Sequence, residues 1–243
     1  MPPSVSRYVR KRHAHIGVLA SGGLDSSILV GWLLQRGWRV QPFYVRTDVV
    51  WAAAEQRALE AFLSEVRDAL LRPLVVLEMR LADLYGPHWS ITGEGQPHAS
   101  TPDDAVYLPG RNPLLVIKPA LWCLMHGVER LALATLAANP FADATARFCR
   151  KFAAALSLSA GRRIKLLRPF ARLQKRQVML LGRHLPLEHT CSCLVPTPEG
   201  LHCGQCNKCA ERQAAFRLAG MSDPTTYAAA ACSPGDQAGG LHD

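Results

Sequence analysis

Several features that define other protein classes are absent from this sequence of 243 residues. No apolar run approaches the roughly 18 residues that a transmembrane helix needs, so no membrane span is expected. The charged N-terminal segment 1–15 is followed by no apolar signal segment, which favours a cytoplasmic protein. Internal repeats and low-complexity blocks are also missing, which excludes solenoid and fibrous architectures.

Acidic residues are scarce: the chain has 19 Asp and Glu and 28 Lys and Arg, which gives a net charge of +9. The excess of positive charge is dispersed, and its one dense run is the segment containing Arg7, Arg10, Lys11 and Arg12. Dispersed charge favours a solvated surface over a dedicated nucleic-acid face, so no nucleic-acid partner is expected. Hydrophobic residues make up 49% of the chain, which suits a globule with a sizeable core.

Apolar runs and amphipathic segments alternate along the chain, which is typical of a doubly wound α/β fold with a parallel sheet. The expected strands are His15–Ala20, Val40–Val45, Leu74–Glu78, Arg130–Ala134 and Ile164–Leu167. The expected helices are Ile28–Gln35, Ala52–Leu71, Leu114–His126, Ala144–Leu158, Arg172–Gly182 and Glu211–Ala219. Residues 81–113, rich in Gly and Pro, interrupt the alternation and predict a long functional loop. We expect an α/β domain over 13–183, a C-terminal metal region over 184–232, and flexible tails at 1–12 and 233–243.

The segment Ser21–Ser27 (SGGLDSS) has the composition of a phosphate-binding loop. Gly22 and Gly23 let the backbone approach a ligand closely. Ser26 and Ser27 fall at the start of the expected helix, where free N–H groups attract an anion. No lysine follows the glycines, so this is not a Walker loop. The alternative is a glycine-rich turn before a serine-capped helix, but the position between a strand and a helix favours phosphate binding.

Four of the eight cysteines, Cys193, Cys203, Cys206 and Cys209, fall within 17 residues. In a chain without a secretory signal, this clustering favours a metal over disulfides. Four thiolates close a tetrahedral Zn²⁺ site, and an iron–sulfur cluster is the main alternative. Cys191 is a second candidate for the position of Cys193. The remaining three cysteines, Cys123, Cys149 and Cys232, are interpreted as buried free thiols.

Five ordered motifs extend this pattern over some 200 residues of the chain. Ser21–Ser27 matches SGGxDS, Pro109–Asn112 matches PGRN, Thr190–Cys193 matches TxSC and His202–Cys209 matches HCGxCxxC. Lys175 opens the helix before the cysteines, and Arg212 and Phe216 match a trailing CxxRxxAF. In these motifs the sequence resembles the ExsB/QueC family of PP-loop ATP pyrophosphatases, the 7-cyano-7-deazaguanine synthases of queuosine biosynthesis.

The resemblance implies an ATP-dependent ligase that converts 7-carboxy-7-deazaguanine and ammonia into the nitrile, with release of AMP and pyrophosphate. It implies ATP, Mg²⁺ and Zn²⁺ as cofactors, and only the resemblance suggests a homodimer. The implied catalytic residues are Asp25, Ser26, Arg111 and Lys175. The implied ATP-binding residues are Ala20, Ser21, Gly22, Gly23, Leu24, Asp25, Ser26, Ser27, Arg111 and Asn112.

Each of the isolated residues in this set also has a simpler interpretation. Arg111 and Lys175 are otherwise surface cations, placed on a loop and a helix. Asn112 either contacts the ribose or base of ATP or caps the helix that follows it.

Some segments depart from the family pattern and leave the substrate open. Where the family usually has Tyr-Gly-Gln-Arg-His, this chain has Tyr44–Asp48 (YVRTD). Where the family has Gly-Tyr-Pro-Asp-Cys-Arg, this chain has Pro140–Thr145 (PFADAT), which keeps the aspartate as Asp143 but has Thr145 in place of the arginine. Candidate substrate residues are Asp143, Tyr85, His88 and Trp89, although such aromatics more often pack a loop onto the core. The alternatives are a ligase for another carboxylate, a PP-loop enzyme that modifies tRNA, and a nucleotide sensor without catalysis.

Overall fold

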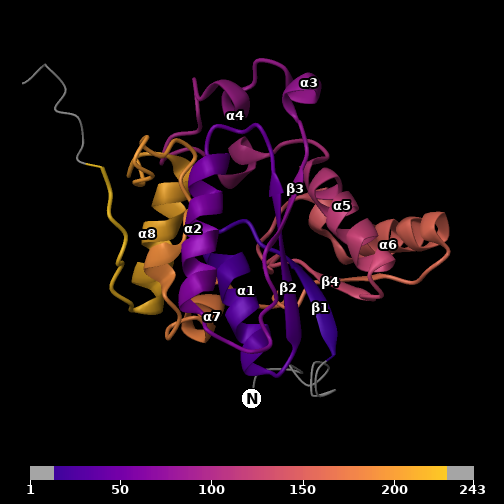
Figure 1. Cartoon of the computed structure of the whole chain (residues 1–243). Coiled ribbons are helices and arrows are strands. Elements are labelled where there is room, and N and C mark those ends of the chain that lie inside the picture. The colour runs from indigo at the N-terminus through magenta and orange to yellow at the C-terminus, as the bar shows by residue number, and fades with distance from the viewer. Residues whose placement is uncertain (1–13, 229–243) are drawn as a thin grey trace, which may run out of the picture.

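The computed structural model describes residues 14–228 of the chain (Figure 1). The basic run at Arg7–Arg12, the expected tails and Cys232 lie outside the described residues. Within residues 14–228, no helix is both long enough and apolar enough to cross a lipid bilayer.

A five-stranded parallel sheet forms the centre of the fold. Its strands are β1 (His15–Leu19), β2 (Arg39–Arg46), β3 (Val75–Glu78), β4 (Arg130–Ala132) and β5 (Lys165–Leu167), in the order β3-β2-β1-β4-β5. Ile16 and Val18 of β1 are fully buried, because helices cover both faces of the sheet. The predicted doubly wound α/β class is therefore confirmed.

Helices on the two faces of the sheet come from different parts of the chain, as Figure 1 shows. One face carries α1 (Leu24–Gln35), α2 (Ala52–Glu65), α7 (Lys175–Leu181) and α8 (Asn207–Ala219). The other face carries α5 (Arg111–Met125) and α6 (Ala146–Ala160). Short 3-10 turns occur at Asp103–Val106, Ala142–Ala144 and Leu187–His189. The C-terminal helix α8 packs against α7, and α7 packs against α1, although α1 is far from both in sequence.

Several predicted boundaries are corrected by tertiary contacts. The helix expected to reach Leu71 ends at Glu65, because the backbone of residues 70–72 instead hydrogen-bonds to Val40 of β2. The expected loop 81–113 contains two single-turn helices, α3 (Ala82–Tyr85) and α4 (Trp89–Thr92). Helix α5 begins at Arg111, three residues before the predicted start, so Arg111 lies in its first turn.

The strand order places a topological switch point between β1 and β4. The chain runs outward from β1 to β2 and β3, and then returns to the other side of β1 with β4 and β5. In open α/β sheets, the loops after the two strands at such a point diverge and leave a crevice at their carboxyl ends. The segment Ser21–Ser27 follows β1 directly, so the fold puts it in this crevice.

Candidate active site at the switch point

The loop between β1 and α1 is held by its own serines and by α2. The Ser26 hydroxyl accepts the Ser21 backbone N–H at 3.1 Å and donates to the Gly23 carbonyl at 3.2 Å. Gly22 has φ of +80°, and a Cβ there would lie 2.5 Å from the Glu55 carbonyl oxygen. Only glycine combines that backbone angle with so close an approach.

A cavity of about 560 Å³ opens beside this loop. That volume is in the usual range for small-molecule sites. The carboxyl ends of β1 and β4 form its floor, with Ala20, Ser21, Leu133 and Thr135. Further walls come from Trp51, Glu55, Arg111, Asn112, Phe141, Lys175, Cys191, Ser192, Lys208 and Glu211.

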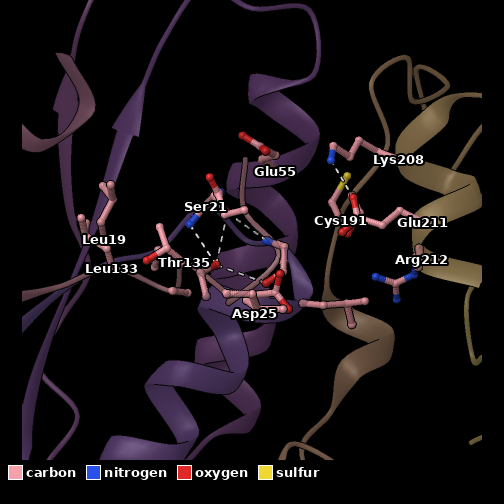
Figure 2. Close-up of a pocket in the computed structure, with 18 of the residues that line it drawn as sticks. Leu19, Ser21, Asp25, Glu55, Leu133, Thr135, Cys191, Lys208, Glu211 and Arg212 are labelled. Atoms are coloured by element: carbon pink, nitrogen blue, oxygen red, sulfur yellow. Dashed lines mark hydrogen bonds and ion pairs between the residues drawn. The ribbon is translucent and has the colours of Figure 1, made fainter. Parts of the chain in front are cut away.

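Four alternating charges join the loop to α7 and α8. The Lys175 ammonium lies 2.7 Å from Asp25 and 3.1 Å from Glu211. Lys208 lies 2.6 Å from Glu211 (Figure 2). Burial raises the pKa of Asp25, and Lys175 opposes that rise. For Glu211, burial is outweighed by Lys175 and Lys208, which lower its pKa to about 2. Burial is likewise outweighed at Lys175, whose pKa is raised by its two carboxylate partners, so Lys175 remains charged.

Unpaired polar atoms cluster around the loop. Among residues 14–228, six buried side-chain polar atoms have no hydrogen-bond partner. Three of the six belong to residues that line this cavity, and a fourth belongs to the loop behind that lining. They are Asp25 Oδ1, Ser27 Oγ, Arg111 Nε and Thr135 Oγ1. Buried polar groups are normally paired, so a cluster of unpaired ones indicates that a polar ligand completes the site. Hydrogen-bond donors from serine, threonine and arginine suit the phosphates of a nucleoside triphosphate, and one carboxylate suits its Mg²⁺.

The structure brings most of the predicted nucleotide site together. Ala20, Ser21, Gly23, Leu24, Asp25, Ser26, Arg111, Asn112 and Lys175 line the cavity. Gly22 and Ser27 lie in the same loop behind that lining. The sequence alone left Arg111 and Lys175 open as surface cations, whereas both face the cavity in the fold.

Asn112 and Asp143 form a contact with each other. The Asn112 side-chain amide donates to Asp143 Oδ1 at 2.9 Å, and its backbone N–H donates to Oδ2 at 3.3 Å. The Asp143 carboxylate therefore satisfies an N–H group in the first turn of α5, which has no side-chain cap of its own. Asp143 is buried against the helix and is not among the residues that line the cavity.

The three candidate substrate aromatics pack the segment 81–101 instead of lining the cavity. Tyr85 donates its hydroxyl to the Pro109 carbonyl at 2.8 Å, and His88 Nδ1 lies 3.0 Å from the Ser90 hydroxyl. Trp89 stacks on Trp51 with ring centroids 5.7 Å apart. Trp51 lines the cavity, so Trp89 reaches the site through this stacking contact.

Sequence reasoning missed Glu55, Trp51, Lys208, Glu211 and Thr135 as cavity residues. Glu55 lies on the buried side of α2, one turn after Trp51. A carboxylate on the apolar side of a helix was the feature of the sequence that could have identified it. Lys208 and Glu211 were visible only as polar residues near the cysteines. The sequence does not show that Thr135, which follows β4, lies beside the loop that follows β1.

The four predicted metal ligands form one group. The sulfur atoms of Cys193, Cys203, Cys206 and Cys209 all lie within 4.8 Å of one another. A tetrahedral Zn²⁺ site with Zn–S bonds of about 2.3 Å needs sulfur separations of about 3.8 Å, so this group could hold a metal ion. Among the described residues, Cys191 lies outside the group and lines the cavity instead.

Local structure orients these sulfurs. Cys206 is the N-cap residue of α8, and Cys209 lies in the first turn of that helix. Backbone N–H groups of Leu194, Val195 and Cys203 donate to sulfur at 3.4, 3.3 and 3.2 Å. Such donors stabilise metal-bound thiolates.

The segment that leads into the cysteine group contacts the loop Ser21–Ser27. The Cys191 backbone N–H donates to the Gly22 carbonyl at 2.8 Å. Ser192, the next residue, donates its N–H to His202 Nε2 at 3.1 Å. The segment that leads into the cysteine group therefore also forms one wall of the cavity.

A parallel sheet with a glycine-serine loop at its switch point, and a C-terminal four-cysteine group beside that loop, defines an α/β protein of the PP-loop type. Comparison with known families agrees with this class. The family model described as queuosine biosynthesis protein QueC matches residues 15–220. The chain belongs to the QueC family.

Curated relatives match most of the chain. A 7-cyano-7-deazaguanine synthase of Methanopyrus kandleri is 32% identical over 86% of this chain and 97% of its own length. That of Syntrophobacter fumaroxidans is 28% identical over 86% of this chain and 94% of its own length. The chain matches 48% of the longer 7-cyano-7-deazaguanine synthase 2 of Sulfurisphaera tokodaii, at 26% identity over 89% of this chain.

Similarity to solved structures is more distant. The U34-tRNA thiolase NcsA from Methanococcus maripaludis, solved with its [4Fe-4S] cluster, superposes with a TM-score of 0.49 at 17% identity. The superposition covers 79% of this chain and 63% of that one. A likeness at this level bears on neither the function nor the metal.

Proposed function

We propose that the protein converts 7-carboxy-7-deazaguanine and ammonia into 7-cyano-7-deazaguanine with two ATP, releasing AMP and pyrophosphate. Family membership supports the overall reaction. The observation that carries the ATP chemistry is the set of three unpaired buried polar atoms, Asp25 Oδ1, Arg111 Nε and Thr135 Oγ1, on residues that line the cavity beside the loop Ser21–Ser27. These atoms lie at the one end of the sheet where a switch-point ligand binds.

The chain's own residues fit activation of an oxygen by transfer of AMP. A carboxylate oxygen is a poor leaving group, and its adenylate is a good one, so ammonia then forms the amide. Adenylation of the amide oxygen and loss of AMP form the nitrile. Both rounds need the same in-line attack on an α-phosphate, so one loop serves both.

Residues would divide these tasks as follows. The loop N–H groups and the hydroxyls of Ser21 and Ser26, which line the cavity, would hold the leaving pyrophosphate. Arg111 would neutralise the oxygen that attacks. Asp25 would hold Mg²⁺ through its unpaired Oδ1, while Lys175 holds its other oxygen at 2.7 Å. When bound, Mg²⁺ supplies positive charge that favours departure of pyrophosphate.

Zinc is proposed for the cysteine group, with no part in the chemical steps. Four thiolates leave no open position for water, so the ion would be structural. Its expected effect is to fix the start of α8, from which Lys208 and Glu211 reach the cavity.

A ligase for another carboxylate is the second candidate. It is favoured by the position of Thr145, where the family pattern has arginine. Thr145 is the N-cap of α6 and accepts the Phe148 N–H at 3.2 Å, so it is occupied with helix capping. Pro140 and Phe141 from the same segment line the cavity, which alters the wall on that side.

The test is incubation of purified protein with ATP, Mg²⁺, ammonium and 7-carboxy-7-deazaguanine, with product masses and nucleotides measured. The expected products are the nitrile and two AMP per nitrile. AMP formation with only a different acid would favour the second candidate. ADP and phosphate as the only nucleotide products would overturn both.

A further inference from the structure

Glu55 is an acidic side chain at the cavity that none of the tasks above uses. It lies one turn into α2, and its carboxylate lines the cavity between the phosphate loop and Arg111. Its backbone carbonyl abuts Gly22, so its position relative to the loop is fixed by main-chain packing. Figure 2 shows it beside Ser21, on the side of the loop opposite Asp25.

The surroundings of Glu55 are defined by groups from four elements. Tyr44 of β2 lies with its hydroxyl 3.5 Å from Glu55 Oε2, and the same hydroxyl donates to the Ala52 carbonyl at 2.8 Å. The Trp51 side chain also hydrogen-bonds to Glu55. Arg111 of α5 and Cys191 of the loop before α8 are the other charged or titratable groups that face it.

These surroundings keep Glu55 near the midpoint of its titration in neutral solution. Burial raises the pKa of Glu55 to about 7, against the opposing effects of Arg111, Tyr44 and Trp51. A carboxylate with such a pKa accepts a proton and returns it to solvent with little cost in either direction. Lysozyme-type acids illustrate how an apolar pocket produces this behaviour.

The proposed reaction releases protons from nitrogen at two stages. When ammonia displaces AMP from the adenylated acid, a C–N bond forms, the C–O bond to AMP breaks, and nitrogen loses one proton. In the second round, the amide oxygen attacks the α-phosphate and pyrophosphate leaves. The nitrile then forms as the C–O bond to AMP breaks and nitrogen gives up its last two protons.

We propose that Glu55 is the general base that accepts these protons from the substrate nitrogen. The inference rests on the proposed function, because it assigns a residue to that reaction. Arg111 would hold the oxygen that carries AMP, and Glu55 would face the nitrogen on the same carbon. Asp25 is unsuited to this role, because Lys175 occupies one of its oxygens and its other oxygen faces the loop's ligand.

The test compares Glu55→Gln with Glu60→Gln. Both remove one carboxylate from α2, but Glu60 is exposed on that helix and lies outside the cavity. The first adenylation is followed as the burst of pyrophosphate from ATP and 7-carboxy-7-deazaguanine without ammonium. The later steps are followed as amide formed after addition of ammonium, and as nitrile formed from supplied amide.

Glu55→Gln is expected to retain the pyrophosphate burst and to slow amide and nitrile formation by about 10²–10⁴-fold, the range for loss of a general base. The rise of native nitrile formation with pH, centred near the pKa of about 7, should disappear in this variant. Glu60→Gln should match the native protein in every step. Glu55→Asp, which keeps a carboxylate, should retain the pH-dependent rise at a lower rate, and it serves if Glu55→Gln does not fold.

Other outcomes overturn the inference. A parallel loss of the burst and the later steps, or weaker binding of Mg²⁺ and ATP, would make Glu55 a ligand or positioning residue. Persistence of the pH-dependent rise in Glu55→Gln would exclude it as the base. If the native protein gives no burst with this acid, the proposed function itself fails, and the inference fails with it.

Discussion

Lys175 and Asp25 are 150 positions apart in the sequence, yet their side chains are 2.7 Å apart in the fold. The contact joins the first residue of α7 to the first turn of α1, and Lys175 also reaches Glu211 of α8. One cation therefore ties the loop Ser21–Ser27 to both C-terminal helices.

Asp25→Ala is expected to abolish pyrophosphate release while the fold persists. Lys175 keeps Glu211 as a partner, so no buried charge is left without an ion pair. Lys175→Gln should reduce release as well, because it leaves Asp25 and Glu211 close together without the cation between them. Lys151→Gln, an exposed lysine on α6, is the control. Pyrophosphate release and circular dichroism measure the two effects, and full activity in Asp25→Ala would contradict the assignment.

Gly22→Ala should remove ATP binding, and Gly37→Ala should not. Both glycines have positive φ, so alanine strains the backbone at each by about 1–3 kcal/mol. A Cβ at position 22 also meets the Glu55 carbonyl at 2.5 Å, whereas nothing lies within 4 Å at position 37. Calorimetric titration with ATP distinguishes the two variants. If both lose similar stability and bind ATP with equal affinity, the close approach of Gly22 to the Glu55 carbonyl is unimportant for ATP binding.

Cys206→Ser is expected to lower the metal content well below one ion per chain. Cys123→Ser removes a buried thiol outside the group of four and should leave the metal content unchanged. Elemental analysis measures both, and zinc without visible absorption is expected for the native protein. Detection of iron and sulfide, with a broad visible absorption, would show that the group holds an iron–sulfur cluster and not zinc.

Glu211 should make folding sensitive to acid. Its pKa is lowered from 4.5 to about 2 by Lys175 and Lys208 against the effect of burial, so its contribution is present above about pH 4.5. The contribution is lost as the pH falls from 4.5 towards 2. Glu211→Gln should therefore unfold at a lower urea midpoint than the native protein at pH 6 and approach it near pH 2. If the urea midpoints of the variant and the native protein differ equally at both pH values, ionised Glu211 is not the source of the acid sensitivity.

Local patterns were sufficient for the element order and for the two motifs. The apolar runs around Ile16 and Val40 predict buried strands, and glycines followed by serines predict a loop at a helix start. The cysteine spacing likewise predicted a group of four sulfurs, although only the fold decided between Cys191 and Cys193. Boundaries were less accurate where tertiary contacts compete, as at residues 70–72, which bond to β2 instead of extending α2.

The residues around the motifs were decided by the tertiary structure. The sequence shows Glu55, Lys175 and Glu211 as three separate polar residues on amphipathic helices. They share one cavity because the sheet order returns the chain beside β1, and because α7 and α8 pack on the face that carries α1 and α2. Side-chain periodicity tells which face of a helix is buried, but not which neighbour buries it. That choice depends on long-range packing, and here it assembled the charges of the site.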